Sequence, residues 1–184
     1  MKRAIIYKLL ILIGLSINLG NVSAQSQSEV KPVESSIFDD YIKGYYSQVF
    51  GINITEILNT DLYSVVEKWL GTPYKYAGKS LNGIDCSGFT QLIYKLNGYQ
   101  LLRDASQQVE IGTPLSFVEE AEAGDLAFFD NEEGNIVHVG MVLENQQIIH
   151  ASGCVRIDKF DHYGIFHSDN KKYSHMLRVI KKII

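Results

Sequence analysis

The sequence predicts an α+β domain, with helices in the first half of the chain and one antiparallel sheet in the second. Up to about residue 97, apolar side chains recur at helical spacing. After Gly124 the chain becomes a series of short runs rich in β-branched and aromatic residues, which turn residues separate. Helices followed by strands, without an internal repeat, indicate this class. The 184 residues, 46% hydrophobic and 21% charged, suffice for one core.

Residues 1–24 have the layout of a secretory signal peptide. Three basic residues accompany an apolar stretch from Leu9 to Ile17, and the small residues of "VSA" end at Ala24. The stretch is shorter than the roughly 20 residues of a membrane span. We therefore expect cleavage after Ala24, export to the periplasm or the outside, and no membrane association afterwards. Losing the three basic residues changes the net charge from −4 to −7, which disfavours binding to nucleic acid.

Three helices are expected after a polar leader. The first lies within "IFDDYIKGYYSQVFGI" and the second within "NTDLYSVVEKWLGTP", where Gly71 and Pro73 end it. The third follows Asp85, a favourable N-cap residue, and runs from Cys86 to about Leu96. The five strands are expected within "DLAFFD", "NIVHVGMVLE", "QQIIHAS", "CVRID" and "HMLRVIKKII".

Cys86, one of two cysteines, lies where a glycine-rich loop becomes a helix. Free N–H groups and the helix dipole at that point favour a thiolate, and the small neighbours Ser87 and Gly88 leave the sulfur accessible. These features predict a nucleophile. Two other interpretations stay open: a disulfide with Cys154, which an exported protein permits, and a buried cysteine that acts as a small apolar residue.

A nucleophilic cysteine needs a base, and His138 and His150 are the candidates because each lies in an apolar strand. If the turn between their strands is centred on Asn145, the two histidines are diagonal neighbours on one face of the sheet. A shift of one residue would separate them. The other histidines are expected to be surface or structural residues: His162, His167 and His175.

Several motifs together resemble the NlpC family of bacterial cell-wall cysteine peptidases. They are "GTPYKYAGKSLNGIDCSGFTQLIY", "LLRDASQQ", "AGDLAFF" and "HVGMVLENQQIIHAS". The resemblance covers about residues 60–180 and implies a papain-like core, in which a cysteine-bearing helix packs on a small antiparallel sheet. It divides the chain into a signal peptide (1–24), a leader and helical segment (25–58) and an NlpC-type catalytic domain (59–184).

The resemblance also implies roles for individual residues. By position, Cys86 matches the family's nucleophile, His138 its base, and His150 the polar residue that orients the base. Tyr74 matches a tyrosine near the oxyanion site. Asp85 and Ser87 match residues that bind the free amino group of a terminal L-alanine in some members. Two positions depart from the family's pattern: Ala77 replaces a frequent glycine, and Leu102 replaces a frequent proline.

The implied substrate is the stem peptide of peptidoglycan, cleaved between γ-D-glutamyl and a diamino acid, and we expect a monomer. The alternatives are a non-catalytic peptidoglycan-binding module, and an amidase or acyltransferase on the same fold. No cofactor is expected, and the absence of C-x-x-C and H-E-x-x-H motifs argues against a metal site. A zinc ion bound by Cys86, His138 and His150 would inhibit a thiol peptidase.

Overall fold

The computed structural model describes residue 66, residues 68–97 and residues 99–183. The predicted signal peptide, leader and first helix, and most of the second helix, lie outside these residues. The described helices are α5 (Cys86–Leu96), α6 (Ala105–Gln108) and the short 3-10 helix η1 (Val118–Glu120). No helix in these ranges is long and apolar enough to cross a membrane.

Nine strands are described, and the five strands predicted after Gly124 are among them. The two short strands β1 (Lys79–Ser80) and β2 (Gly83–Ile84) pair with each other before α5. The others are β3 (Thr113–Leu115), β4 (Leu126–Asp130), β5 (Ile136–Leu143), β6 (Gln147–Ser152), β7 (Cys154–Asp161), β8 (Gly164–His167) and β9 (Lys172–Lys182).

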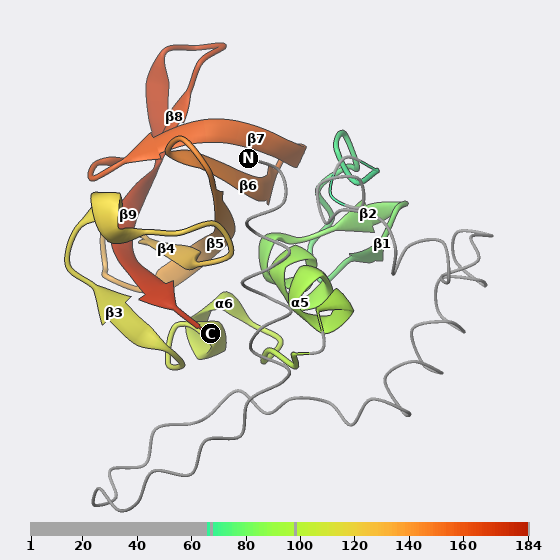
Figure 1. Cartoon of the computed structure of the whole chain (residues 1–184). Helices are drawn as coiled ribbons and strands as arrows, with labels where there is room; N and C mark the ends of the chain where they lie inside the picture. Colours follow the sequence, from blue (N-terminus) through green and yellow to red (C-terminus); the bar gives the residue numbers. More distant parts are fainter. Residues whose placement is uncertain (1–65, 67, 98, 184) are drawn as a thin grey trace, which may run out of the picture.

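The large sheet closes on itself. Strands β4 to β8 follow one another as an antiparallel meander, and β9 pairs with both β4 and β8. The result is a closed antiparallel barrel of six strands, with β3 added outside along β9 (Figure 1). The predicted papain-like α+β core on a small sheet is therefore wrong, since the secondary structure of the described residues is mostly strand, with two α-helices.

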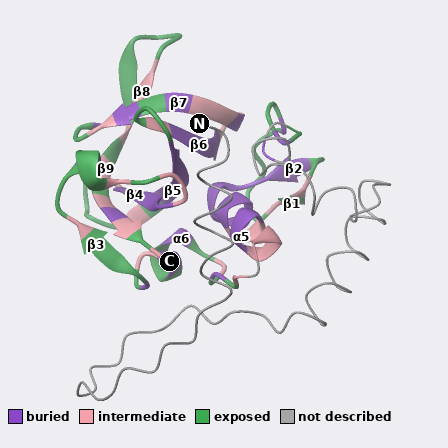
Figure 2. Cartoon of the chain, in the orientation of Figure 1, coloured by how far each residue is buried: buried purple, intermediate pink, exposed green. Residues whose placement is uncertain are grey.

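The barrel has an apolar interior and a second apolar contact on its outer face. One buried cluster takes side chains from all six strands and fills the interior, with Phe129, Ile148 and Phe160 among its members. The other joins α5 residues such as Phe89 to the opposite faces of the strands, which present Met141 and Ile149 among others. Figure 2 shows buried residues on α5 and on β4, β5 and β6. Helix α5 is therefore held against the outside of the barrel.

Candidate active site

Helix α5 begins at Cys86, as the sequence predicts. The side chain of Asp85 caps it, because Oδ1 accepts a hydrogen bond of 2.7 Å from the backbone N–H of Gly88. A Cβ added at Gly88 would lie 2.7 Å from that same Oδ1 and 2.8 Å from the carbonyl oxygen of Gly78. A larger residue at position 88 would therefore push against the capping carboxylate and the backbone of Gly78.

Cys86 lies against strand β5 and is 7% exposed. Burial raises the pKa of its thiol, and the Asp85 carboxylate raises it further, whereas N–H groups that point at the sulfur lower it. One of those N–H groups belongs to Val139, the residue after His138. The thiol pKa is thus raised rather than lowered by the site as a whole, contrary to the expectation from the helix start alone.

His138 and His150 meet as the hairpin geometry predicts. Strands β5 and β6 pair around Asn145, with Gly140 opposite His150, so His138 is the diagonal neighbour of His150 on the same face. His138 Nε2 lies 2.9 Å from His150 Nδ1. Both rings are almost completely buried, with exposed fractions of 4% and 0%.

A third imidazole, that of His175 on β9, stacks on His138. The ring centroids are 4.0 Å apart and the planes differ by 24°. Burial, then His175, then His150 lower the pKa of His138 well below its ordinary value. Burial and the neighbouring histidines lower the pKa of His175 to about 4. His138 is therefore a neutral imidazole at pH 7.

A carboxylate extends this chain of contacts beyond His150. His150 Nε2 lies 3.0 Å from Asp158 Oδ2, and Arg156 holds the same carboxylate through bonds of 2.6 and 2.9 Å. Arg156 also donates to Asp169 at 3.1 Å. The described contacts thus run from His138 through His150 and Asp158 to Arg156.

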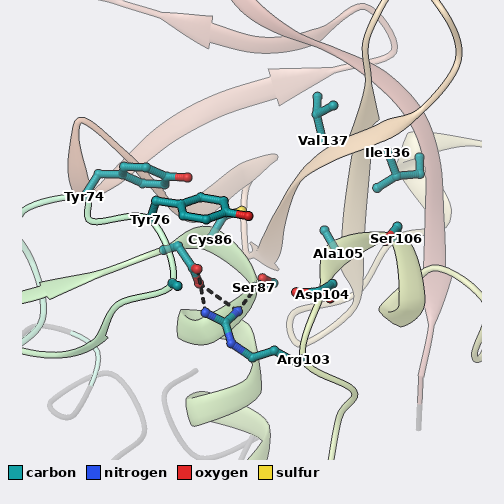
Figure 3. A pocket seen from close by; sticks show the side chains of 12 residues that line it. Tyr74, Tyr76, Cys86, Ser87, Arg103, Asp104, Ala105, Ser106, Ile136 and Val137 are labelled. Carbon is teal, nitrogen blue, oxygen red and sulfur yellow. Dashed lines mark hydrogen bonds and ion pairs between the residues drawn. The ribbon is translucent and has the colours of Figure 1, made fainter.

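A pocket of about 400 Å³ opens beside Cys86, within the range of small-ligand sites. Figure 3 shows the rings of Tyr74 and Tyr76 near Cys86, the Arg103 guanidinium near Ser87, and Val137 across from the tyrosines. The rest of the lining consists of Ala77, Asp85, Asp104, Ala105, Ser106 and Ile136. His138 and His150 are not among the residues that line the pocket.

The predicted amine-binding residues Asp85 and Ser87 lie in the pocket wall, and both accept hydrogen bonds from the guanidinium group of Arg103. Arg103 donates to Asp85 Oδ1 at 3.1 Å and to Oδ2 at 2.6 Å, and to Ser87 Oγ at 3.0 Å (Figure 3). Gln108, which is fully buried, donates to the carbonyl oxygens of Ser87 and Leu102 and so ties the start of α5 to the segment that carries Arg103.

The remaining predicted positions lie around this pocket. Tyr74 lines it and is 40% exposed, and burial followed by the nearby Cys86 raises its pKa. Ala77 has φ 57°, a conformation that glycine adopts more readily. Leu102 is half exposed. Cys86 and Cys154 are both free thiols, so the structure does not contain the disulfide that the sequence left open.

Comparison with known proteins assigns the chain to a family. The family model described as the NlpC/P60 family matches residues 71–175, which is more than half of the chain. The chain belongs to the NlpC/P60 family. The match spans the α5 start, the pocket segment and all three stacked or paired histidines, so the geometry described above lies within the family domain.

Three similar proteins place this NlpC/P60 chain among its relatives. It is 43% identical over 89 residues to the probable endopeptidase NlpC of Escherichia coli, covering 47% of this chain and 57% of that protein. It is 42% identical over 85 residues to the γ-D-glutamyl-L-lysine dipeptidyl-peptidase of Bacillus subtilis, covering 45% and 28%. An NlpC/P60 protein of Bacillus cereus has a similar structure, with a TM-score of 0.56 and 30% identity over 67% of this chain and 39% of the other. The chain thus spans less than two thirds of these relatives.

Four residues of the site in this NlpC/P60 chain were not predicted from the sequence. Arg103 had a signal, because it lies in the motif "LLRDASQQ". Arg156 and Asp158 share one strand face in "CVRID", and Arg156 lies opposite His150. His175 had been assigned to the surface or to a structural role, and its stacking on His138 depends on the closing strand β9.

The described part of the chain contains no group of three or more histidine, cysteine, aspartate or glutamate residues arranged to hold a metal ion. Cys86, His138 and His150 therefore do not form a zinc-like cluster in this NlpC/P60 structure.

Proposed function

We propose that this chain is an exported cysteine peptidase that hydrolyses peptidoglycan stem peptides at the bond between γ-D-glutamyl and a diamino acid. Membership of the NlpC/P60 family supports a peptidase, and a relative named for the γ-D-glutamyl-L-lysine bond supports the substrate. The observation that carries the proposal is the position of Cys86 between an open pocket and the strand that holds His138.

In the proposed reaction, the free enzyme holds a neutral thiol and a neutral imidazole. Burial raises the pKa of Cys86 and lowers that of His138, so the proton stays on sulfur until the substrate arrives. His138 accepts that proton as the sulfur forms a bond to the carbonyl carbon. The tetrahedral intermediate then collapses to a thioester, and His138 returns the proton to the leaving amine. Water, activated by His138, hydrolyses the thioester and restores the thiol.

The start of α5 supplies the groups that would stabilise the oxyanion. The N–H groups of Cys86 and Ser87 point toward the sulfur, and such N–H groups are effective donors to a developing negative charge. Tyr74 lies near Cys86 on the pocket wall and is a second donor through its hydroxyl group.

The pocket wall also suits the free amino group of a terminal L-alanine. Its charged residues are Asp85, Arg103 and Asp104, so it carries one net negative charge. Among the described residues, Asp85 Oδ2 accepts one hydrogen bond, from Arg103, and a carboxylate oxygen can accept two. We therefore assign Asp85 and Ser87 to an amine subsite that favours already trimmed stem peptides.

The same proposal covers the whole chain. Residues 1–24 are a signal peptide, 25–58 a leader and helical segment, and 59–184 the catalytic domain, which acts as a monomer in the periplasm or outside the cell. The layout of basic, apolar and small residues before residue 25 supports export.

The first experiment is mass spectrometry of purified mature protein incubated with L-Ala-γ-D-Glu-meso-diaminopimelate and with the same peptide acetylated at its amine. We expect release of L-Ala-D-Glu from the free-amine peptide alone. Replacing Cys86 by alanine should abolish the product, because no acyl-enzyme can form. Cys154→Ala is the matched control, since it removes the other thiol and should retain activity.

The other outcomes are equally informative. Cleavage of both peptides would keep the peptidase and remove the amine subsite. Cleavage by Cys86→Ala would exclude Cys86 as the nucleophile. Absence of cleavage by the native protein, with Cys86 shown to be a free thiol, would favour a peptidoglycan-binding module or an acyl substrate of another class.

A further inference from the structure

Asp158 is a buried carboxylate that contacts His150, the hydrogen-bond partner of His138. It is 4% exposed. Its Oδ2 lies 3.0 Å from His150 Nε2 and 2.6 Å from Arg156 Nε, while Oδ1 lies 2.9 Å from an Arg156 Nη. Strand pairing explains the meeting, because Arg156 lies opposite His150 on β7 and Asp158 is two residues farther along the same face.

The carboxylate is ionised at neutral pH. Burial alone would raise the pKa of Asp158, but hydrogen bonds from His150 and Arg156 outweigh it and lower the pKa to about 2. An ionised carboxylate only accepts hydrogen bonds. His150 Nε2 therefore carries a proton and donates a hydrogen bond to Asp158.

The Nε2–H group of His150, fixed by Asp158, determines which nitrogen carries the proton on each of the two histidine rings. Burial lowers the pKa of His150 despite the neighbouring Asp158, so its ring is neutral and Nδ1 has no proton. Nδ1 must then accept from His138 Nε2, which lies 2.9 Å away. A neutral His138 with its proton on Nε2 keeps Nδ1 free of a proton and able to accept one.

We propose that Asp158, held in place by Arg156, is a positioning residue that acts through His150 to keep His138 in the tautomer whose Nδ1 accepts the Cys86 proton. This inference rests on the proposed function for the direction of proton transfer. The same carboxylate also stabilises the positive charge that His138 gains when it takes the proton. Asp158 touches neither substrate nor thiol, so its effect is transmitted by the hydrogen-bond chain.

Other ionisable groups face this chain and define its electrostatics. They are Arg156 on β7, Asp169 after β8, His167 on β8 and His175 on β9. His167 Nε2 lies 3.9 Å from Asp158 Oδ2, beyond hydrogen-bond distance. The direct hydrogen-bond partners of Asp158 are thus His150 and Arg156 among the residues described.

The tautomer can be read directly from the ¹⁵N spectrum of protein labelled at histidine. Protonated and unprotonated ring nitrogens have different chemical shifts, and a His150→Gln variant assigns the signals. At pH 7 we expect both His138 and His150 to carry their proton on Nε2. A wild-type spectrum in which His138 carries it on Nδ1 would overturn the proposal without any substrate.

Asp158→Asn removes the charge with little change in volume. We expect part of the His138 and His150 populations to carry the ring proton on Nδ1 instead of Nε2. We also expect kcat to fall about 10²-fold, which is less than the roughly 10⁴-fold loss seen when a carboxylate that touches the base directly is replaced. KM should change less than about 3-fold, since Asp158 is not in the pocket. Asp161→Asn, the same change on the same strand, is the control and should leave kcat and the spectrum unchanged.

A double-mutant cycle separates positioning from a merely structural effect. In a His150→Gln background, Asp158→Asn should lower kcat by less than about 3-fold more, because its route to His138 is already lost. A full second loss, or a loss of kcat with an unchanged tautomer, would refute the proposal. If the wild type cleaves no stem peptide, the proposed function fails, while the spectrum still tests the hydrogen-bond chain.

Discussion

At the scale of single residues, burial decides the protonation of the candidate nucleophile and base. A helix start favours a thiolate, but Cys86 is almost completely buried and borders the Asp85 carboxylate, and both effects raise its pKa. Burial also lowers the pKa of His138. Both shifts favour the neutral pair over a thiolate–imidazolium pair, so the substrate must drive the proton transfer.

This protonation state predicts the pH dependence of alkylation. In Cys154→Ala protein, where Cys86 is the remaining thiol, the rate of reaction with iodoacetamide should rise with pH and have its midpoint above the ordinary thiol value of 9.0, because the thiolate is the reactive form. The rates are measured by mass spectrometry between pH 5 and the highest pH at which the fold persists. Fast alkylation that is constant from about pH 5 to pH 8 would instead indicate a resting ion pair.

At the scale of secondary structure, the start of α5 combines a helix cap with a charged pocket wall. The same Asp85 carboxylate accepts the Gly88 N–H and the Arg103 guanidinium. The bounds of α5 were predictable because a cap and a terminal Asn-Gly are local signals. The partner of Asp85 was not predictable, because Arg103 is 18 residues away. The buried Gln108 holds the segment of Arg103 beside α5 through hydrogen bonds to the carbonyl oxygens of Ser87 and Leu102.

Two substitutions at Asp85 separate the cap from the charge. Asn caps helices about as well as Asp, whereas Ala does not. Asp85→Ala should therefore lower the free energy of unfolding by about 1 kcal/mol more than Asp85→Asn, as measured by urea denaturation. Both variants should raise KM for the free-amine peptide, because each removes the carboxylate. Equal stability of the two variants would exclude the cap, and an unchanged KM in Asp85→Asn would exclude the charge from substrate binding.

In the β5–β6 hairpin, which carries His138 and His150, the contacts between adjacent strands were likewise predictable and those with distant strands were not. The meeting of His138 and His150 could be predicted because the turn at Asn145 sets the register of two adjacent strands. The carboxylate behind them could not be assigned, since it required the pairing of β6 with β7 and the conformation of Arg156. His175 reaches His138 from β9, which the sequence placed as a strand without indicating its neighbours.

At the scale of the whole molecule, closure of the barrel is what the sequence did not reveal. Runs rich in β-branched and aromatic residues between turn residues identify strands, and they served for β4 to β7 and for β9. Closure depends on β9 pairing with β4 on one side and β8 on the other, and these are contacts between distant segments. The short strand β8 was absent from the predicted strands, so the predicted small antiparallel sheet had no closing partner for β9.

A substitution at Gly164, where β8 begins, tests how much closure of the barrel contributes to the stability of the fold. It has φ +141°, and a Cβ there would overlap the carbonyl oxygen of His175 on β9. Gly134, in the turn between β4 and β5, has φ +80° and no atom within 4 Å of an added Cβ. Both alanine variants would incur backbone strain, but only Gly164→Ala must separate β8 from β9.

We expect Gly164→Ala to lower the free energy of unfolding by at least about 2 kcal/mol more than Gly134→Ala, as overpacking against a backbone that cannot move away typically requires. Urea denaturation of both variants measures the difference. Because His175 stacks on His138, Gly164→Ala should also reduce kcat, whereas Gly134→Ala should leave it near the wild-type value. Equal stabilities would show that β8 and β9 can move apart with little loss of unfolding free energy. A destabilised variant with full kcat would show that the site on β5 and β6 does not depend on closure of the barrel.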